Sequence, residues 1–244
     1  MAEPGSPFAS PEPAARGRFF GGKRLFHDRR EAGRKLAAAL THLKSQHPLV
    51  LALPRGGAPV AFEVAELLDA EMDVVLVRKL AAPGHPELGL GAVVDGSAPQ
   101  VVLNEAVVAQ VRPQPGYIEA EISRQLVEIQ RRRLLYRGQH PASDPHGRTV
   151  ILVDDGVATG GGVRAALKAV RHARPRRIVL AVPVAPRDTI AALRGLADEI
   201  ICLATPEPFH AVGLFYEDFT QTEDAEVVAL LARRRRLEGP AAGH

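Results

Sequence analysis

Short apolar runs of strand length alternate along this chain with segments that have the apolar spacing of helices. The apolar runs lie at residues 49–53, 73–77, 149–153, 177–182 and 199–203. Helical spacing is found at residues 28–43, 59–68, 163–172, 188–196 and 224–235. Strands that are buried on both faces read as continuous apolar runs, and strands that alternate with helices form parallel sheets. The pattern predicts an α/β fold in which helices flank both faces of a mostly parallel sheet.

The middle of the chain departs from this alternation. Residues 78–90 are interrupted by Pro and Gly and predict a loop, whereas residues 91–103 predict a hairpin with its turn near Asp95 and Gly96. A long charged helix is expected over residues 118–136. One stripe of this helix carries Ile122, Leu126, Ile129 and Arg133. We expect the helix to cover either the sheet edge or a partner subunit.

Composition limits the classes of protein that the chain can represent. With 244 residues, 46% of them hydrophobic, it can bury one sizeable core. Residues 1–18 are rich in Pro, Gly, Ala and Ser and are expected to form a disordered leader, so residues 19–244 are predicted to form a single domain. The single cysteine, Cys202, excludes a disulfide framework and is expected to pack inside a strand. We therefore expect a cytoplasmic protein.

Two kinds of partner are not expected from the composition. No apolar run approaches the roughly 20 residues that span a bilayer, so no membrane partner is predicted. Arginines cluster at residues 131–133, 174–177 and 233–236, but the chain has no Trp and few Tyr to serve as stacking platforms for bases. We therefore predict no nucleic-acid partner and expect phosphorylated small molecules instead.

The strand at residues 149–153 runs directly into the acids Asp154 and Asp155 and then into a Thr-Gly-rich turn before a helix. Ligands of open α/β sheets bind outside the carboxyl ends of the strands. Glycines let backbone amides face a ligand, and the start of a helix adds partial positive charge, so the turn predicts a phosphate site. Carboxylates repel phosphate, which leaves sugar hydroxyls or a Mg²⁺-bound sugar as their natural partners.

Other phosphate-binding loops fit this segment poorly. A dinucleotide-binding loop would show Gly-x-Gly-x-x-Gly directly after the strand, and a nucleoside triphosphate loop would require Gly-Lys followed by Ser or Thr. Neither pattern is present at residues 154–162.

Residues 153–162 resemble the phosphoribosyl-pyrophosphate (PRPP) signature of type I phosphoribosyltransferases, in which two acids precede a short hydrophobic stretch and Thr-Gly. The resemblance extends over most of residues 19–235 to a bacterial group of phosphoribosyltransferases whose substrate is not firmly assigned. It implies the type I fold with a small hood, and it implies that Asp154 and Asp155 hold the ribose 2′ and 3′ hydroxyls. The residues that would cradle the 5′-phosphate are Ala158, Thr159, Gly160, Gly161 and Gly162.

Two positions depart from the family pattern. Hypoxanthine-guanine enzymes carry an acid where this chain has Ala158, so adenine or orotate enzymes are the more similar members at this position. Many members have Thr or Ser where this chain has Gly162, so one hydroxyl contact to the phosphate is missing.

The same resemblance assigns the pyrophosphate site. The turn that follows residues 49–53 is similar to the pyrophosphate loop of the family, with Arg55 as a bidentate phosphate ligand and Gly56 and Gly57 exposing their amides. Arg78 and Lys79 resemble the basic pair that contacts PRPP in adenine-type members. From the residues alone, the segment at Arg55 could equally be a tight turn with a surface arginine. Ordinary solvation of a strand end is the alternative for Arg78 and Lys79.

Two further segments are assigned through the resemblance. Residues 81–90 lie where the family has a mobile lid, in which Glu87 and His85 would handle protons. The hood is expected from residues 19–45 and 203–222. Its base-binding residues would be Phe209, Phe215, Glu217 and Asp218. The alternative for these aromatics is a staple that packs the last helix.

The implied reaction is transfer of 5-phosphoribosyl from PRPP to a small nitrogenous acceptor, such as a nucleobase, with Mg²⁺ as cofactor and release of pyrophosphate. Metal ligation would come mainly from PRPP, with Asp154 and Asp155 as candidate protein ligands. A homodimer is expected. Two alternatives stay open: a PRPP-binding regulator without transferase activity, and a different phosphoester enzyme that uses the same fold.

Overall fold

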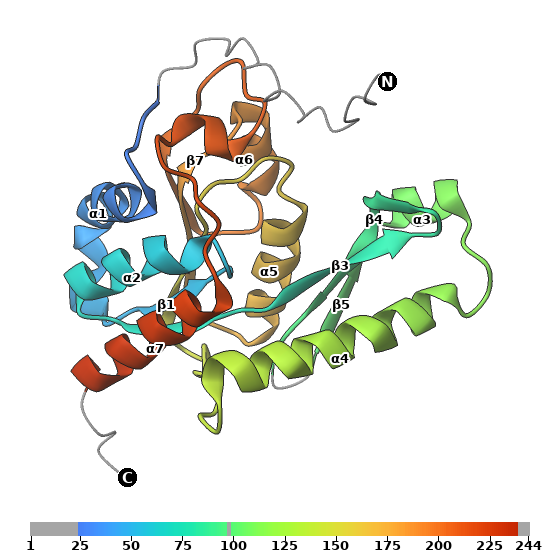
Figure 1. Cartoon of the computed structure of the whole chain (residues 1–244), viewed down its shortest axis with the longest axis horizontal. Helices are drawn as coiled ribbons and strands as arrows, with labels where there is room; N and C mark the ends of the chain where they lie inside the picture. Colours follow the sequence, from blue (N-terminus) through green and yellow to red (C-terminus); the bar gives the residue numbers. More distant parts are fainter. Residues whose placement is uncertain (1–23, 97–98, 239–244) are drawn as a thin grey trace, which may run out of the picture.

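The computed structural model describes residues 24–96 and 99–238, so the predicted leader at residues 1–18 lies outside the described part. Five strands form a parallel sheet: β1 (Leu49–Ala52), β2 (Glu71–Val74), β6 (Thr149–Val153), β7 (Arg177–Val184) and β8 (Glu199–Ala204). Their order is β2-β1-β6-β7-β8, and every neighbouring pair is parallel (Figure 1). The predicted α/β fold is confirmed.

Helices cover both faces of this sheet because alternate residues of each strand point to opposite sides. Val50 and Ala52 of β1 pack in the cluster that holds α2 (Gly57–Leu68) and α7 (Asp224–Glu238). Leu49 and Leu51 pack in the cluster that holds α5 (Gly161–His172) and Leu193 of α6 (Arg187–Leu193). The apolar runs are therefore continuous because both faces of the strands are buried.

The first helix is shorter than predicted. The segment at residues 28–43 forms α1 (Arg29–Ala39) and then a 3₁₀ helix, η1 (Thr41–Gln46). Asp28 caps α1 because its carboxylate accepts a hydrogen bond from the Glu31 amide at 2.7 Å. This cap fixes the direction in which the chain enters the helix.

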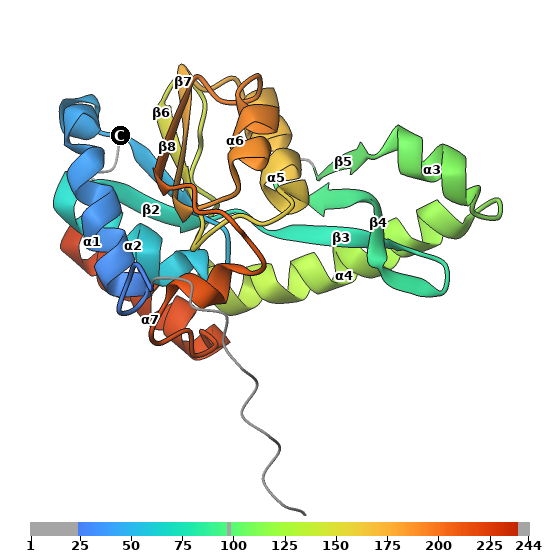
Figure 2. The same cartoon turned by 90° about the horizontal axis from the view of Figure 1, so that it is seen from above.

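A second unit projects from the parallel sheet and is here called the arm, residues 77–137 (Figures 1 and 2). It contains an antiparallel sheet of β3 (Val77–Ala82), β4 (His85–Val94) and β5 (Gln100–Leu103), in that order. Two helices complete it, α3 (Glu105–Val111) and α4 (Tyr117–Arg137). The predicted hairpin over 91–103 is confirmed by the pairing of β4 with β5, and the predicted long helix is α4.

The loop predicted for residues 78–90 is wrong, because these residues form most of the β3–β4 hairpin. Pro83 and Gly84 make its turn, with Gly84 at φ +71°. The pairing jumps from His85 to Gly89, so Pro86 lies in an irregularity of the ladder, where a missing amide costs little. Leu80 and Leu90 are fully buried, and this non-local packing outweighs the local turn signals.

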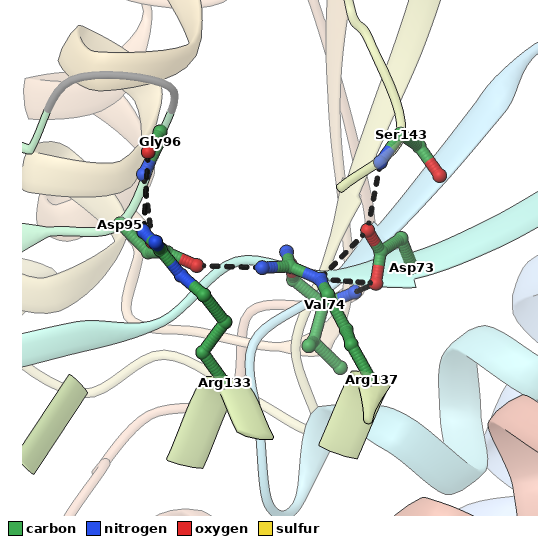
Figure 3. A network of polar contacts seen from close by, with 7 residues as sticks. All are labelled: Asp73, Val74, Asp95, Gly96, Arg133, Arg137 and Ser143. Carbon is green, nitrogen blue, oxygen red and sulfur yellow. Dashed lines mark hydrogen bonds and ion pairs between the residues drawn. The ribbon is translucent and has the colours of Figure 1, made fainter. Parts of the chain in front are cut away.

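A buried polar network joins the arm to the parallel sheet (Figure 3). Arg137 of α4 binds both carboxylate oxygens of Asp73 on β2 at 3.0 Å, and it also binds Asp95 at 2.7 Å and the Val74 carbonyl at 2.6 Å. Arg133 of the predicted α4 stripe donates to Asp95 as well. Because Arg137, Asp73 and Asp95 are all buried, each charge depends on the others for stabilisation. The network therefore fixes where α4 leaves the core.

Residues 25–29 and 209–220 are far apart in the sequence but hydrogen-bonded to each other. They lie within the segments 19–45 and 203–222 from which the hood is expected, and from here on the term hood refers to residues 25–29 and 209–220. The Leu25 and Phe26 amides donate to the Phe215 carbonyl at 2.9 and 3.1 Å, and the Glu217 amide donates to the Phe26 carbonyl at 2.9 Å. Phe26, Phe215 and Tyr216 form a buried cluster with Ala32 and Val184.

Within the part of the chain that the structure describes, no helix is long and apolar enough to cross a bilayer.

Candidate active site

The two acids lie where β6 ends, directly against the turn that follows β1. The Leu53 amide donates to the Val153 carbonyl at 2.9 Å, which continues the pairing of β1 and β6 into the two loops. A Cβ atom on Gly56 would lie 2.0 Å from Asp155 Oδ2, and one on Gly57 would lie 2.8 Å from the Val153 carbonyl oxygen. Only glycines permit this approach. The structure thus brings together two segments that are about a hundred residues apart.

Asp154 and Asp155 have different surroundings. The Asp154 carboxylate accepts the Asp155 amide at 2.9 Å, and no cation among the described residues forms an ion pair with it. Asp155 Oδ2 accepts from Arg29 Nε at 2.7 Å, with side-chain exposures of 13% and 11%. Burial, followed by the adjacent Asp155 charge, raises the pKa of Asp154 well above its usual range. Burial also raises the pKa of Asp155, but Arg29 opposes this rise.

The loop after the acids ends in the start of α5. Gly160 is the N-cap residue, at φ +76°, and no side chain caps the helix. A Cβ atom on Gly161 or Gly162 would meet nothing within 4 Å, so the first turn of α5 faces open space. The Ala158 carbonyl accepts from the Thr189 hydroxyl at 2.7 Å, which anchors the loop to α6. The uncapped amides and the helix dipole together favour a bound phosphate.

Arg55 belongs to the same edge of the sheet. The Pro54–Arg55 peptide is cis, and the Arg55 guanidinium lies 3.8 Å from Glu223 and 4.0 Å from Asp224 at the start of α7. Its side chain is 29% exposed, whereas that of Glu223 is 72% exposed. Ion pairs of this length and exposure are weak, so the guanidinium can exchange them for an anionic ligand.

A helix start without a side-chain cap, two acids and an arginine-bearing turn therefore meet at the carboxyl edge of the parallel strands. The family model of the phosphoribosyl transferase domain matches residues 26–219 of this sequence. The chain belongs to this family. The family predicted from residues 153–162 is confirmed.

Relatives of this phosphoribosyltransferase-family chain include proteins from two Mycobacterium tuberculosis strains, CDC 1551 / Oshkosh and ATCC 25618 / H37Rv. Each has a provisional phosphoribosyl transferase name and is 46% identical over 213 residues. The match covers 87% of this chain and 48% of each relative, so the chain spans about half the length of these relatives. The crystal structure of the protein TT1426 from Thermus thermophilus is 45% identical with a TM-score of 0.74. The match covers 86% of this chain and 98% of that chain.

The structure places the remaining predicted PRPP ligands on the arm. Arg78 Nε donates to Gln125 of α4 at 2.9 Å, and Lys79 lies 3.5 Å from Glu87 across the β3–β4 hairpin. The Glu87 side chain is 98% exposed. Glu87 and His85 lie on β4 close to the turn of the β3–β4 hairpin, which is part of the projecting arm (Figures 1 and 2). Within residues 24–96 and 99–238, no hydrogen bond or ion pair joins them to Asp154 or Asp155.

The predicted base-binding residues all lie in the hood, with different exposures. Phe209 and Phe215 pack with ring centroids 5.0 Å apart, but Phe215 is only 4% exposed, so it supports the hood from inside. Glu217 lies 2.9 Å from the His27 ring, and Asp218 accepts hydrogen bonds from Thr220. Phe209 and Phe215 therefore pack against each other and against the other residues of the hood cluster. No described residue of the last helix, α7, belongs to that cluster.

Sequence reasoning missed two residues that contact the acid pair. Arg29 reaches Asp155 from the first turn of α1, and the Tyr216 hydroxyl donates to the Asp155 carbonyl at 2.5 Å. Burial raises the pKa of Tyr216, which keeps this hydroxyl protonated as a donor. The only signal for Arg29 was its place beside the cap residue Asp28, which does not indicate a partner 126 positions away.

Proposed function

We propose that this chain transfers 5-phosphoribosyl from PRPP to a nitrogenous acceptor, a nucleobase in particular, and releases pyrophosphate. The convergence of Asp154 and Asp155 with the uncapped start of α5 carries the proposal. An anion site beside two carboxylates suits a sugar phosphate, because its phosphate and its hydroxyls need opposite partners.

Each part of PRPP has a matching group in the chain. The amides of residues 158–162, with the Thr159 hydroxyl, would bind the 5′-phosphate. Asp154 and Asp155 would accept hydrogen bonds from the ribose hydroxyls. Arg55 and the amides of Gly56 and Gly57, which abut Asp155, would bind the pyrophosphate. Arg78 and Lys79 lie near the beginning of β3, which follows β2 closely in the sequence, and they are further candidates for pyrophosphate contacts.

Mg²⁺ fits this chemistry because carboxylate and phosphate oxygens are the ligands it prefers. Within residues 24–96 and 99–238, no group of three or more His, Cys, Asp and Glu side chains is arranged to hold a metal ion by itself. Asp154 and Asp155 would hold Mg²⁺ together with oxygens of PRPP. When bound, Mg²⁺ supplies positive charge that offsets the charge of the leaving pyrophosphate.

The transfer exchanges two bonds at the anomeric carbon. The bond to the pyrophosphate oxygen breaks with its electron pair on the oxygen, and the lone pair of the acceptor nitrogen forms the new carbon–nitrogen bond. Positive charge that develops on the ribose lies beside Asp154 and Asp155, which stabilise it. The acceptor nitrogen then loses its proton. Glu87 and His85 are the candidates to accept this proton, and within residues 24–96 and 99–238 no hydrogen bond or ion pair ties either of them to the acids.

A screen of nucleobases and small amines with PRPP and Mg²⁺ tests the proposal by measuring pyrophosphate release. We expect release with at least one acceptor, and loss of release in the Asp154→Asn, Asp155→Asn double variant. Calorimetry without PRPP binding at millimolar ligand in the presence of Mg²⁺ would refute PRPP as the substrate. Binding without release for any acceptor would instead favour the PRPP-binding regulator.

A further inference from the structure

Arg29, the first residue of α1, is held by three side-chain contacts. Its side chain is 11% exposed, and its Nε donates to Asp155 Oδ2 at 2.7 Å. A second nitrogen donates to the Thr220 carbonyl at 2.7 Å, and its guanidinium carbon lies 3.9 Å above the Phe219 ring. Every one of these partners belongs either to the hood or to the acid pair. Arg29 therefore connects these two parts of the site.

Arg29 and the turn after β1 both contact the Asp155 carboxylate. Arg29 binds Oδ2, and the backbone of Gly56 packs against the same carboxylate. These two contacts restrict the orientation of the Asp155 carboxylate. Without Arg29, the carboxylate could rotate and would face the adjacent Asp154 with no cation beside it.

The hood depends on the same contacts. Phe219 packs on Tyr216 with ring centroids 5.0 Å apart, and Tyr216 donates its hydroxyl to the Asp155 carbonyl. The Arg29 guanidinium also packs on the Phe219 ring, and it donates a hydrogen bond to the carbonyl of the next residue, Thr220. The hood is thus attached to Asp155 through both its side chain and its main chain.

We propose that Arg29 is a positioning residue, which orients the Asp155 carboxylate toward the ribose hydroxyls and holds the hood against it. This inference rests on the proposed function, because it assumes that Asp155 binds ribose. It predicts that Arg29 contributes to binding of the sugar but not of the phosphate, since the phosphate site at residues 158–162 is made of other groups.

Calorimetric titration of the full chain with ribose 5-phosphate and with inorganic phosphate separates these contributions. We expect Arg29→Gln to weaken ribose 5-phosphate binding about tenfold or more, the effect of one lost charged hydrogen bond. Binding of inorganic phosphate should change less than about twofold. Arg29→Lys, which keeps the charge, should recover part of the loss. Arg30→Gln is the matched control, because Arg30 lies on the same turn but pairs with Glu63 and Glu226.

A double-mutant cycle with Asp155→Asn tests whether Arg29 acts through Asp155. If it does, the two substitutions should weaken ribose 5-phosphate binding by little more than either one alone. Fully additive effects, or an equal loss of both ligands in folded Arg29→Gln, would overturn the inference and leave a structural role. If Arg29→Gln does not fold, the same two criteria apply to Arg29→Lys. If the parent protein binds inorganic phosphate but not ribose 5-phosphate, the proposed function fails, and the inference fails with it.

Discussion

Replacing Asp154 with Asn should stabilise the folded protein and weaken its ligand binding at the same time. Asp154 is buried beside a second acid, and no cation in the described part of the chain pairs with it. Asn keeps the shape of the side chain and its oxygen acceptor for the Asp155 amide, but it carries no charge. A helix-capping role cannot reverse this expectation, because the N-cap residue of α5 is Gly160.

The sign of the stability change follows from the raised pKa of Asp154. The unfolded chain releases this proton near pH 3.9, whereas the native chain releases it only at a higher pH. As the pH rises between these two values, the native state binds more protons than the unfolded state, so the free energy of unfolding falls. Each pH unit in this window costs about 1.4 kcal/mol. Asp154→Asn removes the cost, so its gain should be close to zero at pH 4 and exceed about 1 kcal/mol at pH 8.

Binding should change in the opposite direction. A charged hydrogen bond to a ribose hydroxyl is worth about 1.5–3 kcal/mol, so ribose 5-phosphate should bind roughly ten- to a hundredfold more weakly to Asp154→Asn. Loss of transfer should be larger, because an amide does not offset positive charge that grows in the transition state.

Urea unfolding at several pH values and calorimetry with ribose 5-phosphate measure the two effects. Asp155→Asn is the matched variant: burial raises the pKa of Asp155 as well, but this substitution also leaves Arg29 without its carboxylate partner, so its gain in stability at pH 8 should be smaller than that of Asp154→Asn. If Asp154→Asn is less stable than the parent at pH 8 while ribose 5-phosphate binding is preserved, Asp154 is a structural residue. The mechanism proposed for the acid pair would then be wrong.

Three other perturbations test separate parts of the structure. Arg55→Ala should lower transfer and PRPP affinity more than ribose 5-phosphate affinity, because Arg55 is assigned to the pyrophosphate; unchanged PRPP affinity and transfer would exclude that role. PRPP with Mg²⁺ should raise the melting temperature by mass action, and the chelator EDTA should remove most of the shift; a shift that persists in EDTA would show that the metal is dispensable. Arg137→Met should lower the free energy of unfolding, measured by urea denaturation, by about 3–5 kcal/mol, because it leaves Asp73 and Asp95 buried without their shared partner. A loss under about 1 kcal/mol would mean that water or Arg133 compensates for the missing guanidinium.

The parallel sheet and the phosphate loop could be predicted because their signals are local in the sequence. The run at β6 is buried on both faces and therefore apolar throughout, and the acids and glycines that follow it are contiguous. The place where β6 ends also fixes where Asp154 and Asp155 lie in the fold. No knowledge of distant contacts is needed for either inference.

The arm could not be predicted in the same way. In residues 78–90, Pro83, Gly84 and Pro86 give strong turn signals, whereas the strands are stabilised by pairing with each other and by burial against α4. The helix α3 could not be predicted because its 7 residues are too few to show a helical period, although Asn104 caps it. Arg133 was read as part of a stripe on α4, but its role in the network of Figure 3 depends on Asp95, 38 positions away.

The difference between local and distant signals also separates the two halves of the proposed chemistry. Groups that would bind the phosphoribosyl part follow single strands, so a short segment is enough to suggest PRPP. Groups that would contact the acceptor lie in the hood, which forms only when residues 25–29 meet residues 209–220. Arg29 belongs to the hood yet binds Asp155, so a change of acceptor-side residues would also change how the ribose is held. The acceptor should therefore be sought by varying hood residues while ribose 5-phosphate binding is monitored, because substitutions at residues 154–162 would remove both functions at once.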